Sequence, residues 1–151
     1  MKAIILLMMV LSVVPVYLYA QENQLQTGFY SVVENDSCTG TSDYLKLKSE
    51  DEEFCINKNP IVTGNDFDSV KIVKDTADHG VEVTLHIKLK SSAIENFKDA
   101  TGKLVGKRLA IVVNNNIIAA PVLSDPIESG EIAVFCDEKT MNEVKEAFHL
   151  E

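Results

Sequence analysis

The sequence lacks the motifs by which many enzymes are identified. No Gly-x-Ser-x-Gly nucleophile motif and no glycine-rich phosphate-binding loop is present. Three histidines are present, without metal-binding spacing to one another or to a carboxylate pair: His79, His86 and His149. We therefore predict a protein that is not an enzyme, with no cofactor, catalytic residue or metal site. A catalytic triad assembled from residues distant in sequence is the alternative that these absences leave open.

Positive charge is scarce. The chain has 14 lysines and arginines against 23 aspartates and glutamates, for a formal net charge of −9. Such an acidic chain is a poor partner for nucleic acid or for an anionic lipid surface. The acidic cluster at residues 50–53 lacks the alternating spacing of a calcium-binding loop, so a solvated turn is expected there.

A long apolar run is found at the N-terminus. Lys2 precedes an apolar segment at residues 3–14, Pro15 ends it, and Ala20 offers a cleavage site. This pattern is typical of a secretory signal peptide. We predict that residues 1–20 are removed, leaving an exported protein, periplasmic or extracellular, without stable membrane insertion. The alternative is a retained anchor, because about eighteen apolar residues span a bilayer marginally.

Cysteine is rare, with three residues in the whole chain. In an oxidising compartment, this number is most simply one disulfide and one free thiol. Cys38 and Cys55 both lie in turn-rich sequence of the N-terminal third, and our hypothesis is that they pair. Closing this loop would stabilise the fold by roughly 3 kcal/mol. Cys136 ends an apolar run and is predicted to be a buried small hydrophobe.

A connector punctuated by proline and glycine, residues 59–67, divides the rest of the chain. We predict a small β-rich N-terminal region at residues 21–59 and an α+β domain at residues 60–151. The N-terminal region contains β-favouring runs at residues 28–33 and 44–48.

The clearest pattern is the strict alternation at residues 81–90. Apolar side chains occupy one face: Val81, Val83, Leu85, Ile87 and Leu89. Polar side chains occupy the other: Glu82, Thr84, His86, Lys88 and Lys90. The alternation predicts a strand packed on one face and exposed to solvent on the other. Residues 68–74 are predicted to form the preceding strand.

Two amphipathic helices are predicted. The first begins near Ser92, which has capping-box spacing to Glu95, and ends at Gly102 or Gly106. The second follows Asp137, a residue that can cap it. Its apolar stripe is formed by Met141, Val144, Ala147 and Phe148.

Apolar runs at residues 109–113 and 117–122 predict a β-hairpin. Three asparagines join them, a residue type that tolerates the positive φ of a tight turn. Pro121 marks an edge or the exit from the second strand. Residues 132–136 predict a further strand, apolar on both faces as in a sheet interior. The whole order predicts an α+β fold, a ferredoxin-like and mostly antiparallel sheet with two helices on one face.

Residues 107–122, KRLAIVVNNNIIAAPV, resemble the SecD subunit of the bacterial protein-export machinery. The resemblance is to the head subdomain of its first large periplasmic domain, which carries a stretch like GKxLAIVLDGxVxSAPxI. Phe97 and Thr101 agree with the family's helix ending in FxxLT, and residues 61–66 with its lead-in VLTGxD. The match covers about residues 60–150.

Departures from the family limit what is implied. Two asparagines stand where the family has Asp-Gly, and Gly130 alone remains of a glycine pair. The family's proteins carry transmembrane helices that couple proton flow to export, and residues 21–151 offer no counterpart. The resemblance therefore implies a head-like module without proton-driven work. In SecD, that module is thought to contact emerging polypeptide.

These observations predict a non-catalytic exported module that binds a protein or peptide partner. The alternative is a structural or assembly component of the cell envelope, and the oligomeric state is left open. Loops on a rigid scaffold commonly carry function. The candidate contact residues are Asn114, Asn115, Asn116, Ser124, Asp125 and Glu128. Ordinary turn chemistry is the other interpretation of these residues.

Overall fold

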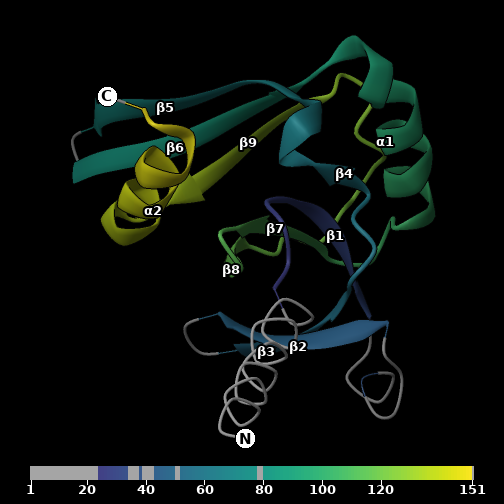
Figure 1. Ribbon diagram of the computed structural model, residues 1–151. Coiled ribbons are helices and arrows are strands. Elements are labelled where there is room, and N and C mark those ends of the chain that lie inside the picture. Colours follow the sequence, from purple (N-terminus) through teal and green to yellow (C-terminus); the bar gives the residue numbers. More distant parts are fainter. Residues whose placement is uncertain (1–23, 34–37, 39–42, 50–51, 78–79, 151) are drawn as a thin grey trace, which may run out of the picture.

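The computed structural model describes residues 24–33, 38, 43–49, 52–77 and 80–150. The predicted signal peptide and His79 lie outside the described residues. Two antiparallel sheets and two helices make up the fold (Figure 1). One sheet has the order β5-β6-β9, formed by β5 (Phe67–Ala77), β6 (Gly80–Leu89) and β9 (Glu131–Cys136).

The other sheet contains six strands in the order β2-β3-β1-β7-β8, with β4 paired to β1. They are β1 (Gly28–Val33), β2 (Tyr44–Ser49), β3 (Glu52–Asn57), β4 (Val62–Thr63), β7 (Leu109–Val113) and β8 (Asn116–Ala119). A short 3-10 helix, η2 (Gly64–Asp66), leads into β5. Helices α1 (Ser91–Lys103) and α2 (Glu138–Phe148) lie at opposite ends of the molecule in Figure 1.

The α+β class and the mostly antiparallel pairing are confirmed. We expected one sheet in the α+β domain at residues 60–151. Its strands are instead divided between two sheets. The reason is that β7 pairs with β1 and β8, and not with β6. Phe29 of β1 lies opposite Ile111 of β7. The boundary predicted between residues 59 and 60 therefore falls inside one sheet.

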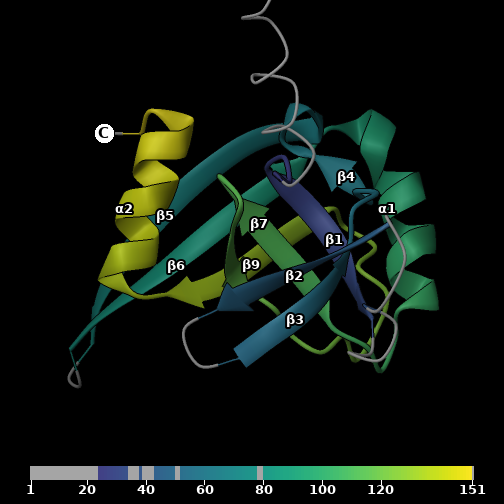
Figure 2. The same ribbon diagram turned by 60° about the horizontal axis from the view of Figure 1, so that its bottom comes forward.

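Strand β7 is buried on both faces, with all five side chains at most 1% exposed. Leu109, Ile111 and Val113 pack with β6, α1 and α2 in the core between the two sheets. Ala110 and Val112 belong to a second core with residues of β1 and β3. In Figure 2, β2 and β3 pass in front of β7, so they form the layer that encloses this second core. Such two-sided burial accounts for the uninterrupted apolar run.

The predicted hairpin is confirmed, with a tighter turn than expected. Asn114 and Asn115 adopt φ angles of 47° and 67°. Both central residues at positive φ are the requirement of a type I′ turn, which asparagine meets at little cost. Asn116 already belongs to β8, opposite Val113. Strand β8 ends at Ala119, two residues before Pro121.

The alternation in β6 is also confirmed. Val83, Leu85, Ile87 and Leu89 are buried, whereas Glu82, His86 and Lys88 are exposed. Strand β5 is longer than predicted. The reason is that β5 pairs with β6 along nearly its whole length, so the length of β6 sets the length of β5.

The predicted capping box at Ser92 and Glu95 is wrong. Helix α1 begins at Ser91 and its N-cap is Lys90, which makes no side-chain capping hydrogen bond. Lys90 is held instead by its backbone N–H, which donates to the Asp66 carbonyl at 2.8 Å. This tertiary contact starts the helix before Ser92. At the other end, α1 stops at Lys103, between the two glycines that we considered.

Helix α2 matches its prediction. The Asp137 carboxylate accepts a hydrogen bond from the Thr140 N–H at 2.7 Å, which makes Asp137 the N-cap. Met141 and Val144 are buried, and the rest of the predicted stripe packs on the core between the sheets.

The expectation for residues 132–136 is wrong in one respect. They lie in a strand, but among the described residues β9 pairs with β6 alone and forms an edge of its sheet. Ile132 is buried, whereas Phe135 is 76% exposed. Apolar residues on both faces do not require a sheet interior, because in the described part of the chain no layer covers one face of this sheet.

Two further predictions concern cysteine and membrane insertion. Cys38 and Cys55 form a disulfide, with Cα atoms 5.7 Å apart, as predicted. Cys136 is free and half-buried. Among the described residues, no helix has the length and apolar character needed to cross a membrane.

We expect Ile111→Ala to lower the free energy of unfolding by about 3 kcal/mol, because it leaves a cavity in the core between the sheets. Urea denaturation measures the change. The exposed Val122, 55% accessible, is the control, and Val122→Ala should change stability by less than about 0.5 kcal/mol. Equal losses in both variants would contradict the central role of β7.

We expect Asp137→Ala to destabilise the protein by about 1 kcal/mol near neutral pH, because α2 loses its N-cap. Hydrogen bonds from Thr140 lower the pKa of the Asp137 carboxyl in the folded protein. Its contribution is therefore present above the ordinary carboxyl pKa and is lost as the pH falls through the lowered value. Asp137→Asn, which caps without a charge, is the control. Urea denaturation near neutral pH and in acid should show a larger loss of stability in acid for the wild type than for this variant.

Candidate functional site

The asparagine turn, one of the predicted contact sites, is tied to the body of the protein. The Leu25 N–H donates to Asn115 Oδ1 at 2.8 Å, and the Asn114 N–H donates to Thr27 Oγ1 at 3.3 Å. Asn116 Nδ2 donates to a Glu143 carboxylate oxygen of α2 at 3.4 Å. These bonds hold the chain before β1 and the middle of α2 against the hairpin.

The loop at residues 124–130, the second predicted contact site, lies against α1. The Ile127 N–H donates to Oγ1 of the buried Thr101 at 3.0 Å, and this hydroxyl in turn donates to the Phe97 carbonyl at 2.9 Å. Glu128 forms an ion pair with Lys98 at 2.8 Å. Ser124 and Asp125 are exposed.

The Lys98–Glu128 pair shifts the pKa of both side chains but contributes little to stability. The hydrogen-bonded Glu128 carboxylate raises the pKa of Lys98, and the Lys98 ammonium lowers the pKa of Glu128. Both side chains lie in solvent, where such pairs stabilise little. One predicted site therefore lies beside α2 and the other beside α1, and the structure does not bring them together. Their role in binding a partner stays a prediction.

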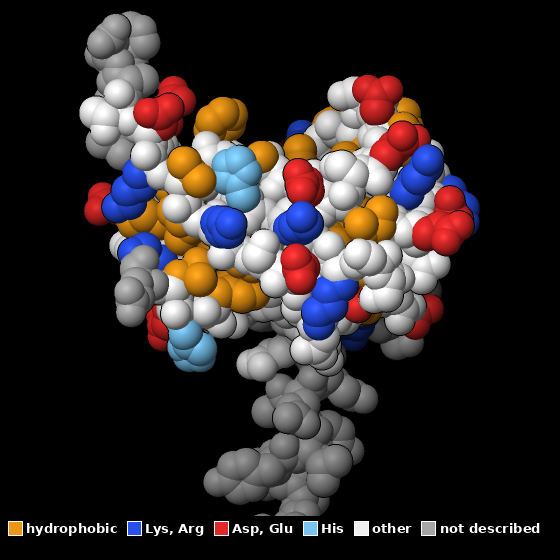
Figure 3. All heavy atoms as spheres, turned by 90° about the horizontal axis from the view of Figure 1, so that it is seen from above, with side chains coloured by type: hydrophobic (Ala, Val, Ile, Leu, Met, Phe, Trp, Pro, Cys, Tyr) orange, Lys and Arg blue, Asp and Glu red, His pale blue; other side chains and the backbone are white. Residues whose placement is uncertain are grey.

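A surface that we did not predict lies on the outward side of the sheet β5-β6-β9. We call it the outer sheet face. Register places these residues on it: Ser69, Lys71, Val73, Asp75, Glu82, Thr84, His86, Lys88, Glu131, Ala133 and Phe135. In the described part of the chain no layer covers this side, which lies uppermost in Figure 1. Figure 3 looks onto it and shows lysine, acidic, histidine and hydrophobic side chains interspersed.

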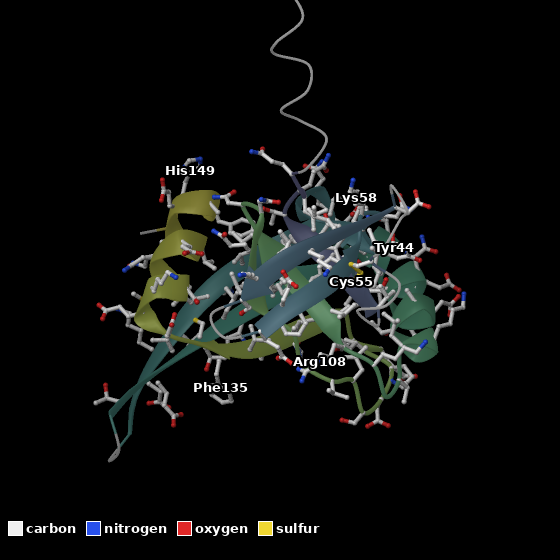
Figure 4. All side chains as sticks on the ribbon, turned by 90° about the horizontal axis from the view of Figure 1, so that it is seen from below. Tyr44, Cys55, Lys58, Arg108, Phe135 and His149 are labelled. Atoms are coloured by element: carbon white, nitrogen blue, oxygen red, sulfur yellow. A yellow bond between two sulfur atoms is a disulfide. The ribbon has the colours of Figure 1, made fainter. Side chains whose placement is uncertain are left out.

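Two large apolar side chains stand exposed on the outer sheet face. Val73 of β5 is 48% exposed and Phe135 of β9 is 76% exposed. Both lie opposite Thr84 of β6, one on each side. The three residues form a row across the sheet in which two apolar side chains flank the methyl-bearing Thr84, and we call it the apolar row. Figure 4 shows Phe135 projecting at the border of the molecule.

The sequence contained a signal for this row. The alternation of β6 predicts a sheet with one solvent-exposed face. Any strand that pairs with β6 and is apolar on both sides must then expose apolar side chains on that face. Residues 132–136 form such a strand, and Phe135 is the residue exposed.

A groove of about 230 Å³ lies where β8 and the end of β9 meet the start of α2. Its lining includes Asn116, Ile118, Phe135, Cys136 and Lys139. Burial raises the pKa of the Cys136 thiol, and the neighbouring Asp137 carboxylate raises it further. The thiol therefore stays protonated near neutral pH, which disfavours a nucleophilic role.

A metal site needs several donor side chains close together, and the described residues do not provide such a cluster. No group of three or more histidine, cysteine, aspartate or glutamate side chains among them is close enough to hold a metal ion. His86 lies exposed on the outer sheet face, and His149 forms the C-cap of α2. Neither of these two histidines therefore lies in a cluster of possible metal ligands.

Comparison with known proteins gives consistent matches. The family model "SecDF, P1 head subdomain" matches residues 42–146. Protein translocase subunit SecD of Aquifex aeolicus is 34% identical over 95 residues, which are 61% of this chain and 18% of that protein. Protein translocase subunit SecD of Acidaminococcus fermentans is 28% identical over 92 residues, covering 61% of this chain and 20% of the relative.

Two solved structures share the fold. One, described as a membrane component SecDF that enhances protein export, superposes with a TM-score of 0.60 at 20% identity, covering 85% of this chain and 63% of that one. SecDF in a super-membrane-facing form gives a TM-score of 0.58 at 21% identity, over 82% of this chain and 18% of that one. The chain spans 18% and 20% of the length of the two SecD relatives. The family model nevertheless covers more than half of the chain, so this protein belongs to the family of SecDF P1 head subdomains.

Proposed function

We propose that this protein is an exported, non-catalytic module that binds polypeptide in the periplasm or outside the cell. The observation that carries the proposal is the apolar row of Val73, Thr84 and Phe135 on the outer sheet face. The names of its relatives support the same reading, since they are subunits of a protein translocase.

The outer sheet face suits a partner that is bound and released. Burying a phenylalanine side chain contributes about 2–3 kcal/mol, and Phe135 offers most of its surface. Around the row stand Lys71, His86 and Lys88, with Glu131 paired to Lys88 at 3.4 Å. Charges of both signs keep such a face soluble when it is empty. Contact with an unfolded chain is the use that this mixture of properties favours.

We expect the purified protein, with its disulfide intact, to bind a fluorescently labelled polypeptide that has been reduced, carboxymethylated and thereby kept unfolded. The double variant Val73→Ser/Phe135→Ser should bind it about tenfold more weakly, because the apolar row is lost. Fluorescence anisotropy measures the dissociation constants.

The matched control is Val105→Ser/Val122→Ser, which changes two valines that are 44% and 55% exposed elsewhere on the surface. This variant should bind like the wild type. If the wild type does not bind the unfolded chain, or if both double variants lose affinity equally, the proposal is wrong. Light scattering on the same samples shows whether the protein self-associates, which would support the alternative of a structural or assembly component.

A further inference from the structure

The direction of the backbone groups along β9 follows from one hydrogen bond. The Leu89 N–H donates to the Gly130 carbonyl at 2.9 Å, which identifies this as a hydrogen-bonded pair. Such pairs recur at every second residue of an antiparallel ladder. The residues of β9 that direct their backbone groups toward β6 are therefore Ile132, Val134 and Cys136. The residues between them direct theirs away from β6.

The outward groups of β9 begin at Glu131 and are capped there. The Glu131 N–H donates to Ser129 Oγ at 3.1 Å, and the Ser129 hydroxyl donates to the Glu131 carbonyl at 3.5 Å. Ser129 thus occupies both outward groups of Glu131. Beyond it, the outward N–H and C=O groups of Ala133 and Phe135 pair with no other strand in the described part of the chain.

The two edges of this sheet differ in their protection. Natural sheets protect edge strands with lysine, proline or bulges. Strand β5 carries Lys71 and Lys74, and its register shifts between Phe67 and Ser69. Strand β9 has a regular register and contains neither lysine nor proline. The edge of β9 is therefore open to pairing with an extended chain.

Side chains beside this edge indicate the chemistry of what pairs with it. Ala133 is exposed, and Phe135 offers an apolar surface at the next outward position. Past β9, acidic residues dominate a shallow hollow along α2. It is lined by Asp137, Glu138, Lys139, Asn142, Glu143 and Glu146. Four carboxylates against one lysine favour a positively charged partner.

We propose that the free edge of β9 binds an extended polypeptide segment by strand addition, with an apolar side chain of the segment beside Phe135 and basic side chains toward α2. The backbone groups of Ala133 and Phe135 form the new ladder. This inference rests on the proposed function and specifies its site and the chemistry of its partner. A second copy of this chain fits less well. In a symmetric antiparallel pair centred on Ala133, Glu131 of each strand would stand opposite Phe135 of the other.

A synthetic peptide tests this inference directly. The probe is a fluorescein-labelled peptide of alternating valine and threonine with two lysines at one end. We expect the protein to bind it, and to bind a version with glutamates for lysines about tenfold more weakly at low salt. A third version, N-methylated at alternate residues, lacks the donors of one edge and should not bind measurably. Equal binding of the methylated and unmethylated peptides overturns strand addition.

Variants of β9 give an independent measurement. Ala133→Pro removes an outward N–H and leaves the ladder to β6 intact, so it should raise the dissociation constant of the lysine peptide about tenfold. Ala133→Val keeps the N–H and is the matched control. Ser129→Ala uncovers both outward groups of Glu131 and should tighten binding severalfold. Circular dichroism checks that each variant folds. If Ala133→Pro does not fold, the comparison of methylated and unmethylated peptide on the wild type tests strand addition instead.

The outcomes separate this inference from the proposed function. One outcome is that Val73→Ser/Phe135→Ser loses affinity for unfolded polypeptide, while Ala133→Pro and Ala133→Val bind it with equal affinity. The proposed function then stands and strand addition is wrong. If the wild type binds no unfolded polypeptide, the proposed function is wrong. If the wild type is a dimer that Ala133→Pro dissociates, the edge pairs with a second copy, and the inference is overturned.

Discussion

The two-sided burial of β7 is the constraint on which the rest of the structure depends. A strand that is apolar on both faces needs a layer on each side. The sheet β5-β6-β9 and the two helices supply one layer, and β2 and β3 supply the other. Phe29 and Tyr30 of β1 belong to different cores for the same reason. The N-terminal strands are therefore part of the same packed structure as the hairpin.

This arrangement also determines which surface is left without a cover. The sheet β5-β6-β9 uses its inner face to cover β7, and no described element covers its outer face. The exposure of Phe135 is thus a consequence of where the core lies. The same surface carries the apolar row and charges of both signs, and β9 forms one of its edges.

Local patterns predicted the elements well where one interaction decides them. The alternation of β6, the Asp137 cap of α2 and the asparagine turn each depend on neighbouring residues in the chain, so short-range reasoning sufficed. The same reasoning failed for the start of α1, because the carbonyl of Asp66 holds Lys90 from a distant position. It also placed β9 in a sheet interior, because apolar residues were equated with burial.

The sequence by itself determined the α+β class, through the order of its local patterns. It also gave the Cys38–Cys55 pairing as a hypothesis and the family as a resemblance, and both are confirmed. Tertiary structure alone decided the division into two sheets, the open edge of β9 and the exposure of Phe135. The physical reason is that strand pairing is a long-range choice. Each apolar strand here has several possible neighbours, and the simultaneous packing of both faces of β7 selects among them.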